Sequence, residues 1–109
     1  MSIPMPFFYI LGPGRIAVPE PDVKAWGNWI MDHERERRVA LDHIGDIEVG
    51  TVFSGFDRNF VDGDPPLVFE TLVFRDGKGA EMCKYATWEE AEKGHRIMVD
   101  LVRSSIVDR

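Results

Sequence analysis

Residues 46–74 read DIEVGTVFSGFDRNFVDGDPPLVFETLVF, and they place two apolar runs on either side of one polar loop. Both runs are rich in Val, Phe, Ile and Thr and are bounded by Gly, Asp and Pro, which is typical of strands. The first run alternates, and one of its faces carries Ile47, Val49, Thr51 and Phe53. The second run, Leu67–Phe74, is apolar on both faces, so we expect a central strand that is covered on each side.

Glu70 interrupts the second apolar run. Burying a lone carboxylate is costly, so this residue requires a partner. We expect it at a margin of the sheet or against an arginine. The alternative is a functional carboxylate, because carboxylates with perturbed pKa values are enriched at sites.

The loop from Asp57 to Pro66 is longer than a plain hairpin requires, since hairpin loops usually take about 2–5 residues. We interpret it as a recognition loop that presents aromatic anchors among polar groups; the alternative is an ordinary solvated connection. A calcium loop is a disfavoured alternative, because setting Gly63 at the required glycine position puts Arg58 at the first ligand position. The candidate partner-binding residues are Phe56, Asp57, Arg58, Asn59, Phe60, Asp62 and Asp64.

Composition narrows the class of protein. The chain has 109 residues, 44% hydrophobic and 29% charged, which suits one globular domain over residues 1–109. A net charge of −6 argues against nucleic-acid binding, which depends on Lys and Arg, and suits a basic partner. We expect no catalytic residues, no metal site and no cofactor, since one Cys and three His make no zinc set.

The cellular setting follows from the cysteine count and the N-terminus. The lone Cys83 excludes an internal disulfide and agrees with a reducing compartment. The N-terminus has no basic region before its apolar run, and no stretch approaches a membrane span, so we expect a cytoplasmic protein.

The N-terminal third predicts a small hairpin and one helix. Residues 7–11 and 15–18 flank a Gly-Pro-Gly turn and are expected to pair at an edge. Asp22 is a good N-cap, and the helix that follows places four residues on one face: Val23, Trp26, Trp29 and Ile30. We expect the tryptophan pair to be core, with a ligand pocket lined by the pair as the alternative. The charged run HERERR at residues 33–38 is expected to be a solvated junction; an arginine cluster that meets Glu70 is the alternative.

Two further strands are predicted on either side of the apolar runs. The first covers residues 38–44, and a Gly45-Asp46 turn would set His43 opposite Glu48 as a surface pair, with an acid–base pair as the alternative. The second covers residues 80–86 after an Asp-Gly turn, and it should bury Cys83 as a small side chain.

The C-terminal helix carries the clearest local signal. Thr87 and Glu90 form a capping box, and the helix that follows is amphipathic. Its apolar face carries Trp88, Ala91, His95, Met98, Val99 and Val102. We expect His95 to be a satisfied core histidine, with a functional histidine as the alternative. The predicted fold is therefore α+β, a mainly antiparallel sheet of four to five strands with this helix and the shorter Trp-bearing helix packed on it.

Several short motifs together resemble a family of small, mostly uncharacterised proteins encoded by bacteriophages and prophages. The motifs are Arg37-Arg38-Val39-Ala40, Thr51-Val52-Phe53, Gly55-x-Asp57, Pro65-Pro66-Leu67-x-Phe69-Glu70-Thr71 and Tyr85-x-Thr87-Trp88-x-Glu90-Ala91-x-x-Gly94-His95. The resemblance implies a phage genome and a host-cell cytoplasm. Family members often have His where this chain has Arg58, and the difference favours binding over catalysis.

Three functions follow as expectations. The first is a phage-type accessory protein that binds a host or phage protein, including inhibition of a host defence or regulatory factor. The second is a small enzyme or ligand-binding domain that uses Asp57, Glu70 and His95 or His43. The third is a virion assembly component, which predicts self-association such as a homodimer.

Overall fold

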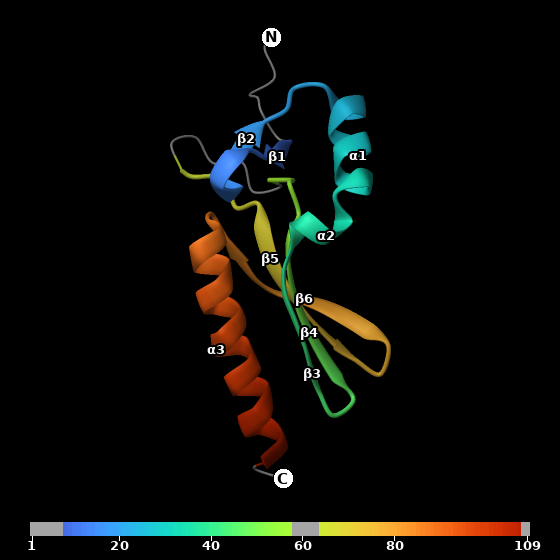
Figure 1. The fold of residues 1–109 in the computed structure, drawn as a ribbon. Helices are drawn as coiled ribbons and strands as arrows, with labels where there is room; N and C mark the ends of the chain where they lie inside the picture. Colours follow the sequence, from blue (N-terminus) through green and yellow to red (C-terminus); the bar gives the residue numbers. More distant parts are fainter. Residues whose placement is uncertain (1–7, 58–63, 108–109) are drawn as a thin grey trace.

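The computed structural model describes residues 8–57 and 64–107, and the fold of these ranges is α+β, as the sequence predicts. The molecule is elongated, with principal extents of 54 × 29 × 26 Å (Figure 1). The elements in chain order are β1 (Tyr9–Leu11), a 3-10 turn (Pro13–Arg15), β2 (Ala17–Pro19), α1 (Val23–Asp32), α2 (Glu34–Arg37), β3 (Arg38–Ile44), β4 (Ile47–Phe53), β5 (Phe69–Arg75), β6 (Lys78–Tyr85) and α3 (Trp88–Val107).

The main sheet has four antiparallel strands in the order β3-β4-β5-β6, so the chain simply folds back on itself at each step. Both predicted two-residue turns are confirmed, because Ile44 pairs with Ile47 and Arg75 with Lys78. The Asp76-Gly77 turn has φ angles of 53° and 75°, the conformation for which Asp-Gly is favoured. Pairing continues up to this turn, so β6 begins at Lys78 rather than at residue 80.

The predicted edge hairpin is also confirmed, but it forms a separate two-stranded sheet of β1 and β2, with Ile10 opposite Val18. It lies with α1 at one end of the molecule, and the turns of the main sheet lie toward the other (Figure 1). A β-bridge between Phe8 and Phe56 and the hydrogen bond from the amide of Tyr9 to the carbonyl of Gly55 connect it to the chain beyond β4.

The predicted burial of the tryptophan pair of α1 is only partly confirmed, because Trp26 and Trp29 are half-buried and Trp29 packs against the core around Phe53. Asp22 caps the helix as predicted, accepting from the amides of Lys24 and Ala25 at 2.9 and 3.3 Å. However, none of its residues is fully buried, and Val23 is 57% exposed. The helix packs on β1 rather than flat on the main sheet, and Trp29 alone reaches the ring of Phe53, with 5.9 Å between ring centroids.

The charged run HERERR forms the short helix α2 and the start of β3. The guanidinium of Arg37 donates to the carbonyls of Ile30 and Phe53 at 3.2 and 2.9 Å, so it ties the end of α1 to the end of β4. Arg37 therefore meets backbone oxygens, not the carboxylate of Glu70 that the alternative interpretation suggested.

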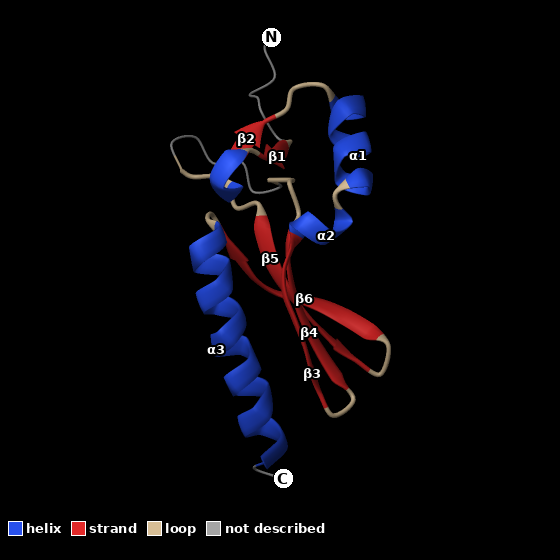
Figure 2. Ribbon diagram, in the orientation of Figure 1, coloured by secondary structure: helices blue, strands red, loops and turns tan. Residues whose placement is uncertain are grey.

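α3 packs along one face of the main sheet and contacts all four strands (Figure 2). The predicted apolar face is confirmed, since all six of its residues are buried. The capping box is confirmed with one change: the hydroxyl of Thr87 accepts from the amide of Glu90, but the Glu90 carboxylate accepts from that hydroxyl and not from the Thr87 amide, each at 3.1 Å.

The core beneath α3 consists of two apolar clusters. The upper cluster, toward α1, is formed by Phe53, Val68, Phe69, Trp88 and Ala91. The lower cluster, toward the sheet turns, is formed by Val49, Val73, Met98, Val99 and Val102. Polar side chains lie between the two clusters and form the site described below.

Two predictions about exposure are wrong. The second face of β5 is not covered, because no described helix packs along that side of the sheet (Figure 2). Cys83 is exposed rather than buried, because β6 is an outer strand and not an inner one.

Candidate functional site

A continuous chain of polar side chains crosses the sheet beneath α3. His95 is 3% exposed; its Nε2 lies 2.7 Å from Oδ2 of Asp42 and its Nδ1 lies 2.8 Å from Oγ1 of Thr51. Oγ1 of Thr51 lies 2.6 Å from Oγ1 of Thr71, which lies 3.0 Å from the hydroxyl of Tyr85. Each strand of the main sheet contributes one residue to this chain, which we call the polar layer.

The distances allow one consistent direction for the hydrogen bonds, which follows from assigning the proton of a neutral His95 to Nε2. Nε2–H of His95 donates to the carboxylate of Asp42, which leaves Nδ1 as an acceptor for the hydroxyl of Thr51. Thr51 then accepts from Thr71, and Thr71 accepts from Tyr85. Burial raises the pKa of Tyr85, with nearby Cys83 adding to it and the hydrogen bond to Thr71 opposing it, so this phenol stays a donor.

Asp42, His95 and Thr51 have the connectivity of a hydrolase triad, in which a histidine links a carboxylate to a hydroxyl. The hydroxyl here cannot act as a nucleophile. Thr51 is 0% exposed, and its oxygen is already held by Thr71 and His95. Neither Thr51 nor His95 lines any of the five hollows described for this structure, and both side chains are buried between the sheet and α3.

The predicted recognition loop is described only at its two ends. Phe56 is half-buried and packs against Phe8 and Trp26, with ring centroids 5.4 and 6.4 Å apart. Asp57 is 7% exposed, so it is not a surface group, while Asp64 is exposed. The other predicted partner-binding residues lie outside the described residues: Arg58, Asn59, Phe60 and Asp62.

Trp26 fixes the described start of this loop. Its indole N–H is shared between the carbonyls of Tyr9 and Gly55, at 3.1 and 3.0 Å. Gly55 has a φ of 71°, and a Cβ there would lie 2.6 Å from the carbonyl oxygen of Tyr9. Only glycine therefore allows the loop to leave β4 against β1 and Trp26.

The residues of the predicted enzyme do not converge. The side chain of His95 points from α3 onto the sheet. Glu70 is next in sequence to Thr71, so it points to the opposite face of the sheet. There Glu70 is half-buried, and its cross-strand neighbour is Lys84. The His43–Glu48 pair is confirmed at 2.9 Å, and side-chain exposures of 65% and 40% make it a surface contact.

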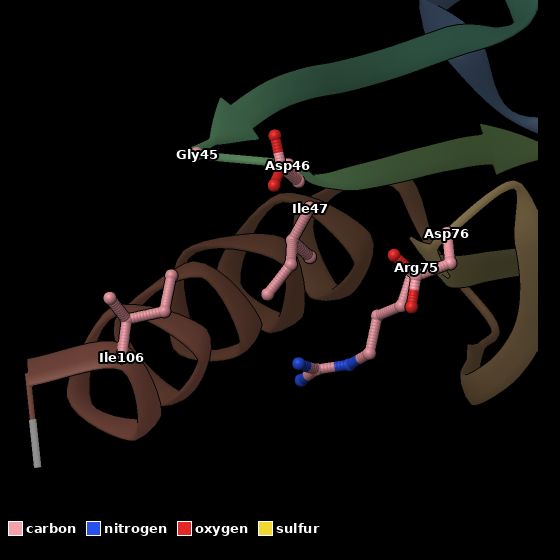
Figure 3. A pocket seen from close by; sticks show the side chains of 6 residues that line it. All are labelled: Gly45, Asp46, Ile47, Arg75, Asp76 and Ile106. Atoms are coloured by element: carbon pink, nitrogen blue, oxygen red, sulfur yellow. The ribbon is translucent and has the colours of Figure 1, made fainter. Parts of the chain in front are cut away.

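The largest hollow found lies at the turn end of the sheet, with a volume of about 390 Å³. Figure 3 shows Arg75 reaching toward α3 from the end of β5, with Ile47 and Ile106 pointing into the space between the sheet and the helix. Gly45, Asp46 and Asp76 complete its lining. Arg75 is the one cationic side chain among its lining residues, and the turn residues around it are exposed, so we describe this hollow as a surface depression.

The uncovered side of the main sheet is the more informative surface, and we call it the open face. It presents an apolar centre formed by Leu41, Val52, Leu72 and Phe74 around Gly50. A depression of about 200 Å³ lies over this centre, where Gly50 has no side chain to fill it, and Arg38 and Glu48 stand at its margin.

The sequence carries a signal for each of two features, the polar layer and the open face. Thr51 and Thr71 each stand in the middle of an apolar face, which indicates hydroxyls that must find each other or a third group. The apolar second face of β5 is evident in the sequence, but burial under a helix and burial by another molecule leave the same pattern.

The described part of the chain lacks two features, a cluster of metal-ligand side chains and a helix that could cross a membrane. Within residues 8–57 and 64–107, no three His, Cys, Asp or Glu side chains come together as metal ligands would. No helix in those ranges has the length and apolar character needed to cross a membrane.

Comparison with known proteins gives no relatives: no protein-family model, no curated protein and no solved structure matches this chain.

Proposed function

We propose that this chain acts by binding another protein, and that the open face of the main sheet is the surface it uses. The observation that carries the proposal is the apolar centre of that face, which no described element covers. Exposed apolar patches with a charged margin are typical of protein–protein interfaces.

The composition of the open face agrees with this role. Phe74 is a half-buried aromatic residue at its centre, and its ring lies over Gly79, where any side chain would displace it. A ring held against the backbone loses little conformational freedom on binding, which suits an interface anchor. Arg38 and Lys84, one on each outer strand, add charges that can set the orientation of a partner.

The net charge of −6 favours a partner whose facing surface is basic. The resemblance to phage-encoded proteins suggests that the partner is a host or phage protein in an infected cell, with inhibition of a host factor as one consequence. The predicted recognition loop stays a prediction, and a separate variant can test it.

The test is affinity capture from host and phage-infected lysates with the wild-type chain and with Leu41→Lys. Leu41 is 40% exposed on the open face, so the substitution places a charge in the interface at little cost to folding. Met31→Lys is the matched control, since Met31 is 77% exposed on α1. The proposal predicts one partner that is retained by the control and lost by Leu41→Lys.

A partner that Leu41→Lys retains would refute the open face as the binding surface. Loss of that partner in the double variant Arg58→Ala with Phe60→Ala would then assign binding to the loop. Light scattering on the same samples tests the assembly alternative, because a stable dimer that Leu41→Lys dissociates would make a second copy the partner.

A further inference from the structure

A second surface, separate from the open face, lies where β6 meets α3. β6 is an outer strand that pairs only with β5 among the described strands, and its residues 78–83 are all exposed. Figure 2 shows the hairpin of β5 and β6 diverging from the C-terminal half of α3. The opposite edge of the sheet, β3, differs because its Asp42 is hydrogen-bonded to His95 of α3.

The divergence leaves a groove between β6 and α3 with a volume of about 210 Å³. Its floor is apolar and comprises Val73, Ala80, Met82, Met98 and Val102. Met82 is the extra residue of a bulge, because the register shifts between the pairs Thr71–Cys83 and Leu72–Glu81. The bulge turns Met82 toward the helix, where the side chain is still 50% exposed.

α3 extends this apolar surface beyond the groove. Gly94 faces β6, since a Cβ there would overlap the ring of Tyr85. Leu101 follows seven residues later, about two helical turns on, so it lies on the same side of α3. Leu101 is 58% exposed and Ile97, one turn earlier, is 55% exposed. A strand added beside β6 would cover these two residues together with Met82.

The charge of the groove selects the kind of strand. Arg75 and Lys78 line its turn end, and no carboxylate is among its lining residues. In a chain of net charge −6 this is a local basic site, which attracts an acidic side chain. In an antiparallel ladder, hydrogen-bonded and non-hydrogen-bonded residue pairs alternate, and Arg75–Lys78 at the turn is a hydrogen-bonded pair. Gly79 and Lys84 belong to non-hydrogen-bonded pairs, so their N–H and C=O groups point away from β5.

We propose that the edge of β6 and its groove against α3 bind an extended segment of another protein, which adds a fifth strand to the sheet. The segment is apolar at alternate positions, where its side chains enter the groove, and acidic at the end beside Arg75 and Lys78. An extended segment fits better than a helix, because a strand edge offers main-chain hydrogen bonds that a helix cannot accept.

The test selects binders for the full-length chain from a display library of random peptides about ten residues long, which matches the length of a strand. We expect the enriched peptides to alternate apolar and polar residues and to carry Asp or Glu near one end. Binding should slow hydrogen exchange of the Gly79 and Lys84 amides, and should protect the thiol of Cys83, the single cysteine of the chain, from alkylation.

Three variants make the test specific. Leu101→Asp and Lys78→Glu should each weaken the selected peptides by about tenfold or more, a difference of about 1.4 kcal/mol. Val23→Asp is the matched control, because Val23 is 57% exposed on α1, and it should leave binding unchanged. Leu101 and Lys78 are surface residues, so folding of each variant can be verified by circular dichroism before binding is compared.

The proposal is overturned if the library yields no peptide that binds the wild type, or if the enriched peptides tolerate both Leu101→Asp and Lys78→Glu. It is also overturned if peptides bind without slowing exchange at Gly79 and Lys84, which would indicate a helix in the groove. Protection of those amides in the protein alone at high concentration would assign the edge to a second copy.

Discussion

His95 and Thr51 occupy the middle of a buried hydrogen-bonded chain, and Tyr85 occupies its end. Burying a polar group costs free energy only when it loses its partner, so the position of a residue within the chain decides how much its removal costs. Removing the hydroxyl of Thr51 leaves both His95 and Thr71 without a hydrogen-bond partner. Removing the hydroxyl of Tyr85 leaves only the oxygen of Thr71 without one of its donors.

The polar layer therefore predicts an order of stabilities. Thr51→Val keeps the shape of the side chain but leaves His95 and Thr71 without their shared partner, and we expect a loss of about 1–3 kcal/mol in the free energy of unfolding. Tyr85→Phe should cost less than about 1 kcal/mol. Urea unfolding of both variants measures the difference, and an equal or reversed order would contradict the proposed direction of the chain.

Gly94 and Gly27 are both helical glycines, but their surroundings differ. A Cβ at Gly94 would overlap the ring of Tyr85, while a Cβ at Gly27 would meet nothing within 4 Å. We expect Gly94→Ala to lower the free energy of unfolding by about 1–3 kcal/mol through overpacking. Gly27→Ala should raise it by about 0.5–1 kcal/mol, because alanine favours the helix. Thermal unfolding shows the sign; destabilisation by both would contradict the described packing of α1.

The two tyrosines of the chain predict a dependence of stability on alkaline pH. Burial raises the pKa of Tyr9 above 10.0, with the charge of Asp57 adding to it, and burial also raises the pKa of Tyr85. Well below pH 10.0 both phenols are neutral in the folded and the unfolded chain. As the pH rises further, the unfolded chain loses these protons first, so the free energy of unfolding falls.

Urea unfolding at increasing pH tests this, with phenolate absorbance as the direct reading of ionisation. The native protein should ionise at higher pH than the urea-unfolded chain. Tyr85→Phe should reduce the fall in stability. Coincident absorbance titrations for native and unfolded chains would show that neither phenol is shielded.

At the scale of the elements, the N-terminal ribbon and α1 form a unit with few attachments to the main sheet. α1 buries no residue fully, and the indole of Trp26 joins β1 to the end of β4 through two carbonyls. Arg37 adds an attachment between Ile30 and Phe53. The unit also packs on the upper cluster, through Tyr9, Leu11, Ala17 and Trp29. Such a unit can open without unfolding the sheet.

Trp26→Phe removes both hydrogen bonds but retains most of the aromatic packing on Phe8. We expect amides of β1, including that of Tyr9, which donates to Gly55 at 2.8 Å, to exchange faster with solvent by about tenfold. Amides of β4 and β5 should keep their wild-type rates. Faster exchange throughout the sheet would show that the unit and the sheet unfold together.

The sequence predicted most elements because their signals are local. The β3–β4 turn, the Asp-Gly turn and the cap of α3 each depend on residues a few positions apart. The partner of His95 could not be found in this way, since Asp42 lies 53 positions away and their contact depends on the order of the strands. Burial of His95 with satisfied hydrogen bonds was predicted. Its place in a chain of side chains that includes one residue from each strand was not predicted.

Exposure was predicted less well, again for a physical reason. The apolar second face of β5 and the apolar stripe of α1 satisfy the same pattern whether they face the core or another surface. Cys83 was assigned to the interior from its residue type alone, and the outer position of β6 leaves it exposed.

At the scale of the whole molecule, α3 covers one side of a four-stranded sheet, and no described helix covers the other side, whose centre is a shallow apolar surface. The buried polar layer joins α3 to β3 and β4 through His95 and continues to β5 and β6 through Thr71 and Tyr85, so we expect the open face to keep its shape without a partner. Rigid surfaces bind with a smaller loss of entropy, and a net charge of −6 adds long-range attraction for a basic partner.

Hydroxyl-radical footprinting of the free chain and of its captured complex tests this claim most directly. Leu72 and Phe74 should be oxidised in the free protein and protected in the complex, while Val23 and Met31, which are exposed on α1, should be oxidised equally in both. Oxidation of Phe74 that is unchanged by the partner would show that the open face is not the binding surface.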